Sequence, residues 1–170
     1  GEAEILSQHL LITYTYAMIG PVGAHPDSRS PAPEPWSEDR VEWVSGGSGE
    51  QLQTAIADAL SDSEPTIVEI TDSCVYQLDI GLIAGATEED GGSLLIRTPL
   101  LIRAASGERP IIRVVRPLRF RPENPEYSEN SIVRLEGLYI TVDNEFLSAD
   151  EPLVGRAALN RLEIINCTLD

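Results

Sequence analysis

The chain has 170 residues, of which 42% are hydrophobic and 5% aromatic, enough for one domain with an aliphatic core plus an extension. Its formal net charge of −16 argues against general affinity for nucleic acid or anionic membranes, because both are bound through basic side chains. The charge is uneven: residues 1–90 hold 17 acids and 2 arginines, and residues 91–170 hold 11 acids and 10 arginines.

Residues 1–20 form an apolar N-terminal arm. The stretch 11–16 (LITYTY) favours a strand, but a helical stripe fits the arm about as well, so both types remain open. The apolar stretch 5–19 contains polar side chains and is too short to span a membrane. Its acidic flank does not fit a signal peptide. The sequence leaves the location unknown, with a cytoplasmic and a particle-associated protein as the alternatives.

Residues 21–47 are predicted to be a Pro-rich linker. The stretch 21–40 contains five prolines and little that could pack. The linker tethers the arm, which could then dock on its own body or on a neighbouring chain.

Residues 48–170 form the predicted main domain, which begins with an amphipathic helix at 49–60. Ser48 or Gly49 can cap this helix, and Glu50 suits the positive end of the helix dipole. One face is apolar and needs a partner surface; it consists of Leu52, Ala55, Ile56, Ala59 and Leu60.

Short β-runs follow the helix, most of them with an apolar residue at every second position. They lie at residues 66–72, 100–105, 110–114, 118–121, 132–142 and 161–169. No tight two-residue turn joins neighbouring runs, which favours parallel strands over a meander of hairpins. A sandwich of two sheets remains the alternative.

A weak internal repeat supports a solenoid of parallel strands. The segments that start at Leu138 and Leu162 have similar patterns 24 residues apart, a spacing typical of one turn of such a solenoid. The pattern stops at Asp170 where another strand would be expected. We expect either a truncated chain or an end that another subunit covers.

The segments IVEITDSCVY, LLIRAASGERPIIRV, VRLEGLYIT and LNRLEIINCTLD, together with the capping helix, carry a family resemblance. Over residues 48–170 the chain resembles right-handed parallel β-helices of the pectate-lyase-like type. Within that class it is similar to β-helical proteins encoded with phage-tail-like contractile injection systems. The resemblance implies a mainly β solenoid with an N-terminal capping helix, and a structural or attachment role without catalytic residues.

Seven arginines lie between residues 97 and 121, where the only acid is Glu108. Outward strand positions could gather them into a basic ridge that binds an anion or an acidic partner; we name Arg103, Arg113, Arg119 and Arg121 as its candidates. The alternative is internal pairing with the surplus acids of residues 1–90.

Asp143 and Glu145 follow a predicted strand and are the alternative candidates, as a carboxylate pair for carbohydrate chemistry. The competing interpretation is a solvated loop. The acidic loop at 87–90 lacks the ligand spacing of a calcium site, and we predict no metal or cofactor. Cys74 and Cys167 are expected to be free thiols, although one bridge between them remains possible.

The sequence therefore predicts a non-enzymatic structural and interaction module of a phage-tail-like or other extracellular particle. Its partners would be other protein subunits, or further copies of itself, contacted through the arm and the open end of the β-helix. The alternative is a β-helix that binds or cleaves acidic polysaccharide.

Overall fold

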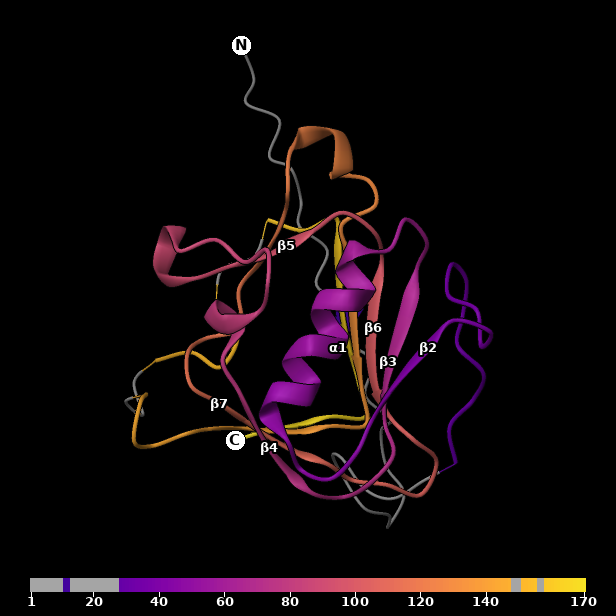
Figure 1. The fold of residues 1–170 in the computed structure, drawn as a ribbon, viewed down its shortest axis with the longest axis vertical. Helices are drawn as coiled ribbons and strands as arrows, with labels where there is room; N and C mark the ends of the chain where they lie inside the picture. Colours follow the sequence, from indigo (N-terminus) through magenta and orange to yellow (C-terminus); the bar gives the residue numbers. More distant parts are fainter. Residues whose placement is uncertain (1–10, 13–27, 148–150, 156–157) are drawn as a thin grey trace.

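The chain is mainly β, and its described residues contain parallel sheets and one α-helix (Figure 1). A computed structural model describes residues 11–12, 28–147, 151–155 and 158–170. Every pair of neighbouring strands in the described sheets runs parallel, which confirms the prediction of parallel strands over a meander.

The largest sheet has six strands in the order β1-β11-β9-β6-β3-β2. These strands are β1 (Leu11–Ile12), β2 (Val41–Val44), β3 (Thr66–Ile70), β6 (Leu100–Ala104), β9 (Ile132–Glu136) and β11 (Arg161–Ile165). Strand β1 belongs to the predicted arm, so the two described residues of the arm form a strand. The other residues of the arm lie outside the described residues.

A second sheet has four strands in the order β12-β10-β7-β4, and a third pairs β5 with β8. These strands are β4 (Val75–Leu78), β5 (Leu94–Ile96), β7 (Ile111–Val114), β8 (Phe120–Pro122), β10 (Tyr139–Val142) and β12 (Thr168–Leu169). Short 3-10 helices lie between strands: η1 (Ile80–Leu82), η2 (Glu89–Gly91) and η3 (Pro125–Tyr127). After β2, the chain repeatedly visits the six-stranded sheet and then the four-stranded sheet.

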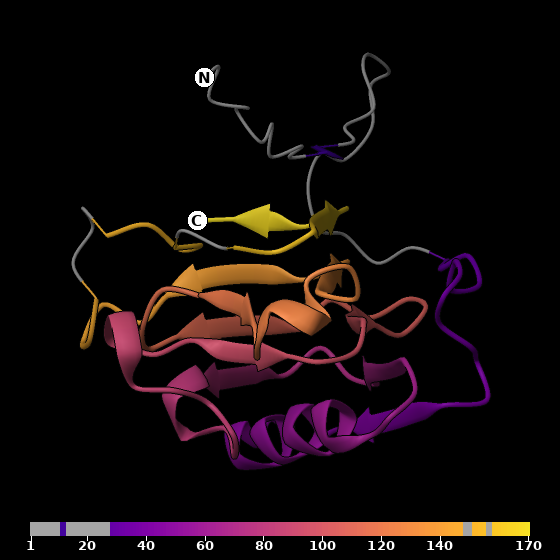
Figure 2. The same ribbon diagram turned by 90° about the horizontal axis from the view of Figure 1, so that it is seen from above.

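Helix α1 (Gly49–Ser61) confirms the predicted helix. The Ser48 hydroxyl accepts a hydrogen bond from the Gln51 amide, so Ser48 is the N-cap. All five residues of the predicted apolar face are buried. This face packs on β2, β3 and β4, and α1 therefore covers one end of the stack of strands (Figure 2).

The sequence analysis was wrong about how two of the β-runs divide. The runs at 132–142 and 161–169 are each two strands, because Gly137 (φ 72°) and Asn166 (φ 51°) turn the chain from one sheet to the next. The alignment of Leu138 with Leu162 at 24 residues was also wrong. It matched the second half of one run with the first half of the other, whereas Leu162 pairs with Val133.

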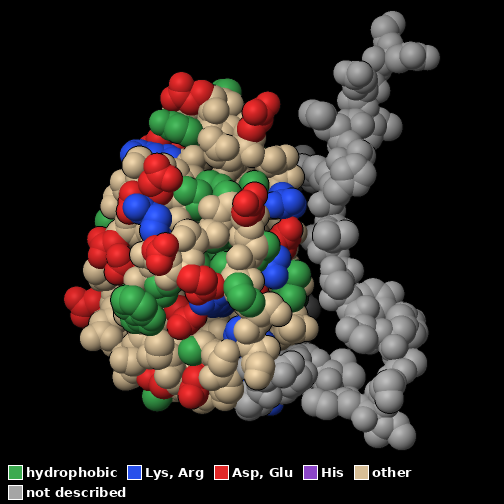
Figure 3. All heavy atoms as spheres, turned by 90° about the vertical axis from the view of Figure 1, so that its right-hand side faces the viewer, with side chains coloured by type: hydrophobic (Ala, Val, Ile, Leu, Met, Phe, Trp, Pro, Cys, Tyr) green, Lys and Arg blue, Asp and Glu red, His purple; other side chains and the backbone are tan. Residues whose placement is uncertain are grey.

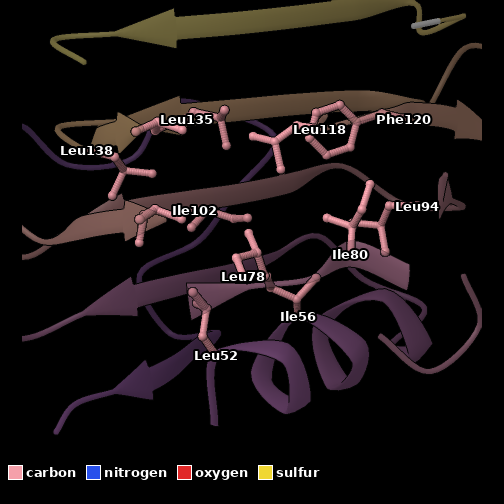
Figure 4. A pocket seen from close by; sticks show the side chains of 12 residues that line it. Leu52, Ile56, Leu78, Ile80, Leu94, Ile102, Leu118, Phe120, Leu135 and Leu138 are labelled. Atoms are coloured by element: carbon pink, nitrogen blue, oxygen red, sulfur yellow. The ribbon is translucent and has the colours of Figure 1, made fainter. Parts of the chain in front are cut away.

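The main core lies between the sheets and beneath α1 (Figure 4). Side chains from α1 and from inward strand positions meet there, among them Leu52, Ile56, Ile102 and Leu135. They leave a residual void of only about 20 Å³ with an apolar lining. A void of this size and polarity is a packing defect of the core and offers no room for a ligand.

Residues 28–40, which we call the cover segment, pack on the outer face of the six-stranded sheet. Trp36 is 4% exposed and forms a second hydrophobic cluster with Ile67 and Leu101. Its indole Nε1 donates a hydrogen bond of 3.2 Å to the Pro99 carbonyl. The range 21–47 that was expected to be a linker therefore contributes both this cover and strand β2 to the fold. Residues 21–27 of that range lie outside the described residues.

The helices of the described part of the chain include none that is both long and apolar enough to cross a membrane.

Candidate functional site

The structure separates the four candidate arginines instead of gathering them into one ridge. Arg103 lies on the outer face of the six-stranded sheet and is only 6% exposed, because the cover segment lies over it. Its Nε donates to Glu69 at 2.7 Å, and its two terminal nitrogens donate to Glu38 at 2.8 and 2.6 Å. Arg103 thus holds the cover segment to β3 and β6, which is the internal pairing that the sequence analysis gave as its alternative.

A second group of charges on the same sheet face is also paired internally. Arg134 donates to Glu136 at 3.1 Å and to Glu163 at 3.0 Å, across β9 and β11. Arg161 lies 3.2 Å from Glu163. Figure 3 views the molecule from the right-hand side of Figure 1; acidic side chains are spread over this face and basic side chains lie between them. The Arg134–Glu163 pair joins neighbouring strands on this face, and the other two pairs lie within one strand.

Arg119 and Arg121 face the loop that follows η1. Arg121 forms an ion pair of 2.7 Å with Glu89 of η2. The guanidinium of Arg119 lies close to Gly91, and its side-chain carbons pass beside Gly155. The acidic stretch 87–90 is therefore joined to the basic segment 119–121 within the chain.

Arg113 is the candidate arginine that faces an open hollow. Gln77, Arg113 and Thr141 are in register on β4, β7 and β10 and form the floor of this hollow. Its volume is about 480 Å³, and Asp143, Asn144 and Glu145 form its wall. Arg113 is exposed and forms no ion pair or hydrogen bond with another described residue. Arg113, Asp143 and Glu145 are thus the predicted residues that the fold brings together.

Asp143 is held firmly at the edge of the hollow. One carboxylate oxygen accepts a hydrogen bond of 2.9 Å from Gln77 Nε2, and the other accepts one of 3.2 Å from the Glu145 amide. The bond from Gln77, then the bond from the Glu145 amide, and the charge of Arg113 lower the pKa of Asp143, although slight desolvation opposes them. Asp143 is therefore an ionised acceptor and is poorly suited to donate a proton as a general acid.

A second hollow adjoins the first, since Gln77 lines both. It measures about 370 Å³ and lies between the first turn of α1, the end of β4 and the loop after β10. Leu82 and Phe146 line it and are 70% and 57% exposed. The sequence analysis missed both residues, because neither belongs to a helical or alternating pattern of apolar positions.

Both cysteines are free. Cys74 is exposed, and Cys167 is partly buried with its sulfur 3.4 Å from the Leu138 amide. Burial raises the pKa of Cys167 to about 11, even though backbone hydrogen bonds favour the thiolate. Within the described ranges, His, Cys, Asp and Glu side chains form no group of three or more that could hold a metal ion.

Comparisons of the chain with protein-family models, with curated proteins and with solved structures found no match.

Proposed function

We propose that the chain is a structural and interaction module, built as a right-handed parallel β-helix and working through contacts with other subunits of a phage-tail-like or other extracellular particle. The order of the strands supports the β-helix. The chain passes from a strand of the six-stranded sheet to one of the four-stranded sheet several times in succession. Each time, the new strand of the six-stranded sheet pairs with the preceding strand of that sheet: β6 with β3, β9 with β6 and β11 with β9. Such stacking, with α1 over one end, is what a capped solenoid requires.

The observation that carries the interaction role is the pairing of β1 with β11. Leu11 lies beside Glu163 and Ile12 beside Ile164, so the arm adds a parallel strand to the sheet edge opposite β2. Strand addition at an open edge gives affinity through main-chain hydrogen bonds and is a common way for proteins to bind one another. An arm that pairs with its own β11 has the backbone conformation needed to pair with the same edge of another subunit.

The internal pairing of the charged side chains supports a structural role for the chain. Arg103 and Arg134 sit at outward positions, where they could have bound an external anion, but each binds two carboxylates of its own chain. These ion pairs connect successive strands and the cover segment, so they support the stack.

The test is recovery of partners from a lysate of the native host, with the full chain as bait and identification by mass spectrometry. A variant with both Leu11→Pro and Ile12→Pro removes two backbone donors from β1. The matched control carries Leu11→Val and Ile12→Val, which keep strand propensity.

Tube, sheath or baseplate-like proteins recovered by the full chain and the valine control, and lost with the proline variant, would support the proposal. Equal recovery by all three baits would show that the arm is not the contact. Retention of acidic polysaccharide with no protein partner would favour the alternative function instead.

A further inference from the structure

We propose that the two adjoining hollows form one groove that binds an extended, basic segment of a partner protein, with an apolar side chain of that segment seated against Leu82 and Phe146. The proposal rests on the interaction role proposed above and assigns it a second contact surface, separate from the arm. The groove lies over β4, β7 and β10 and is bounded by the first turn of α1 and the loop after β10.

The apolar part of the groove is the first argument. Leu82 belongs to η1 in the loop after β4, and Phe146 belongs to the loop after β10; both line the same hollow together with Val115. Both loops lie on the same side of the stack (Figures 1 and 2). They are two of the five large hydrophobic side chains that are exposed in the described part of the chain. Exposed apolar side chains that converge in one concavity are typical of the anchoring point of a protein contact.

The charge of the groove determines the chemistry of the segment. Four carboxylates line it, those of Glu50, Asp79, Asp143 and Glu145, against the single guanidinium of Arg113. Asp79 is paired with Arg116 and Asp143 accepts from Gln77, but Glu50 and Glu145 are exposed and pair with no basic side chain of the described residues. A basic segment is complementary to the two unpaired carboxylates of Glu50 and Glu145, whereas an acidic segment is attracted only by Arg113.

Strand pairing and backbone contacts hold the groove in its shape, which reduces the ordering that binding requires. The floor of the groove consists of paired strands. Leu147, which is 6% exposed, anchors the wall, and its amide donates a hydrogen bond of 3.0 Å to the Asp143 carbonyl. At the α1 end, Gly49 lies so close to the Gln77 carbonyl that a side chain would not fit between them. Preorganisation of this kind favours binding of a flexible segment.

The probe for the test is a fluorescein-labelled peptide of alternating Lys and Leu, with fluorescence anisotropy as the readout and the full chain as the receptor. The matched control peptide alternates Glu and Leu. The groove variant carries Leu82→Ser and Phe146→Ser. The control variant is Trp43→Ser, which removes a side chain that is 69% exposed on β2, away from the groove. Circular dichroism and thermal melting establish that each variant is folded.

We expect the basic peptide to bind the full chain and the Trp43→Ser variant equally, and to bind the groove variant about tenfold more weakly. Glu50→Gln with Glu145→Gln should weaken binding at low salt and reduce its salt dependence. The groove variant distinguishes this site from diffuse attraction to a chain of net charge −16.

Equal binding to the groove variant would overturn the proposal, as would absence of binding. So would preferential binding of the acidic peptide, or of an acidic oligosaccharide, that is lost with Arg113→Gln, since the groove would then be an anion site. These outcomes leave the proposed function intact if the native-host experiment still recovers particle subunits.

Discussion

Arg103 and Glu38 meet through two parallel hydrogen bonds of 2.8 and 2.6 Å, which join the cover segment to the middle of the six-stranded sheet. Planar bidentate pairs of this kind are the strong form of an Arg–carboxylate contact. Glu69 occupies the remaining Nε donor, so Arg103 links β3, β6 and the cover segment at one point. Stability should therefore respond to the ionisation of Glu38.

The hydrogen bonds from Arg103 lower the pKa of Glu38 below its ordinary value of 4.5, more than partial burial raises it. Because the folded-state pKa is below the unfolded-state pKa, the contact contributes fully above about pH 4.5 and is lost as the pH falls through the lower value. Glu38→Gln should cost about 0.5–1 kcal/mol near pH 7, a modest figure because half of the Glu38 side chain is in water.

Urea unfolding between about pH 7 and pH 3 checks this prediction, with Glu34→Gln, at an exposed position of the cover segment, as the control. The Glu38→Gln variant should lose less stability on acidification than the unsubstituted chain. An identical pH profile for the two proteins would contradict the role of the pair.

The two tryptophans should differ sharply in their effect on stability. Trp36 is 4% exposed and Trp43 is 69% exposed. We expect Trp36→Ala to lower the free energy of unfolding by about 3–5 kcal/mol, since it removes a buried indole and its hydrogen bond to Pro99. Trp43→Ala should cost about 0.5 kcal/mol or less. Chemical denaturation measures both; similar losses would show that the cover segment is not a packed part of the fold.

Gly49→Ala should destabilise the protein although it places a better helix former in α1. Alanine gains up to about 1 kcal/mol over glycine in a helix interior, and less at the first turn. Its Cβ would collide with the Gln77 carbonyl, a backbone atom that cannot rotate away. We expect a net loss of about 1–3 kcal/mol in thermal or urea unfolding. Gln51→Ala, at an exposed position of the same helix, is the control and should be neutral or slightly stabilising.

Only one of the two cysteine thiols should react while the protein is folded. Cys74 is exposed, although desolvation and the nearby Asp72 carboxylate raise its pKa and slow its reaction. Cys167 is shielded, with a pKa of about 11. Iodoacetamide at about pH 8 should therefore modify one thiol in the native protein and both in denaturant, as counted by mass spectrometry. Cys74→Ser should abolish the native-state modification. Rapid modification of both thiols in the native protein would contradict the burial of Cys167.

The local signals in the sequence predicted much of the fold. The apolar face and cap of α1 were visible within a dozen residues, and outward positions such as Arg103 and Arg134 followed from alternation. Strands β2, β4 and β5 were missed, and β2 lies within the range 21–47 that was expected to be a linker. The burial of Trp36 could not be predicted, because the surface it packs on is formed by Ile67 and Leu101 and exists only once β3 and β6 are paired.

The candidate site was predictable only in part for the same reason. Alternation placed Arg113 on an outward face, and the position of Asp143 after a strand suggested an exposed carboxylate. Their shared hollow depends on the register of β7 with β10, which the incorrect 24-residue repeat did not supply. The exposure of Leu82 and Phe146 is a property of the assembled loops and has no local signature.

The two hydrophobic clusters lie on opposite faces of the same strands, with Ile67 outward and Val68 inward on β3 and Leu101 outward and Ile102 inward on β6. A slip of one residue would exchange one apolar side chain for another on each face, so hydrophobicity alone distinguishes poorly between alternative alignments of these strands. The ion pair between Glu69 and Arg103 does distinguish the correct alignment from a shifted one. After a shift of one residue, each of these charged side chains would lie beside an apolar residue instead of its ionic partner. The charged side chains that pair with one another on this sheet thus also help to fix the alignment of its strands.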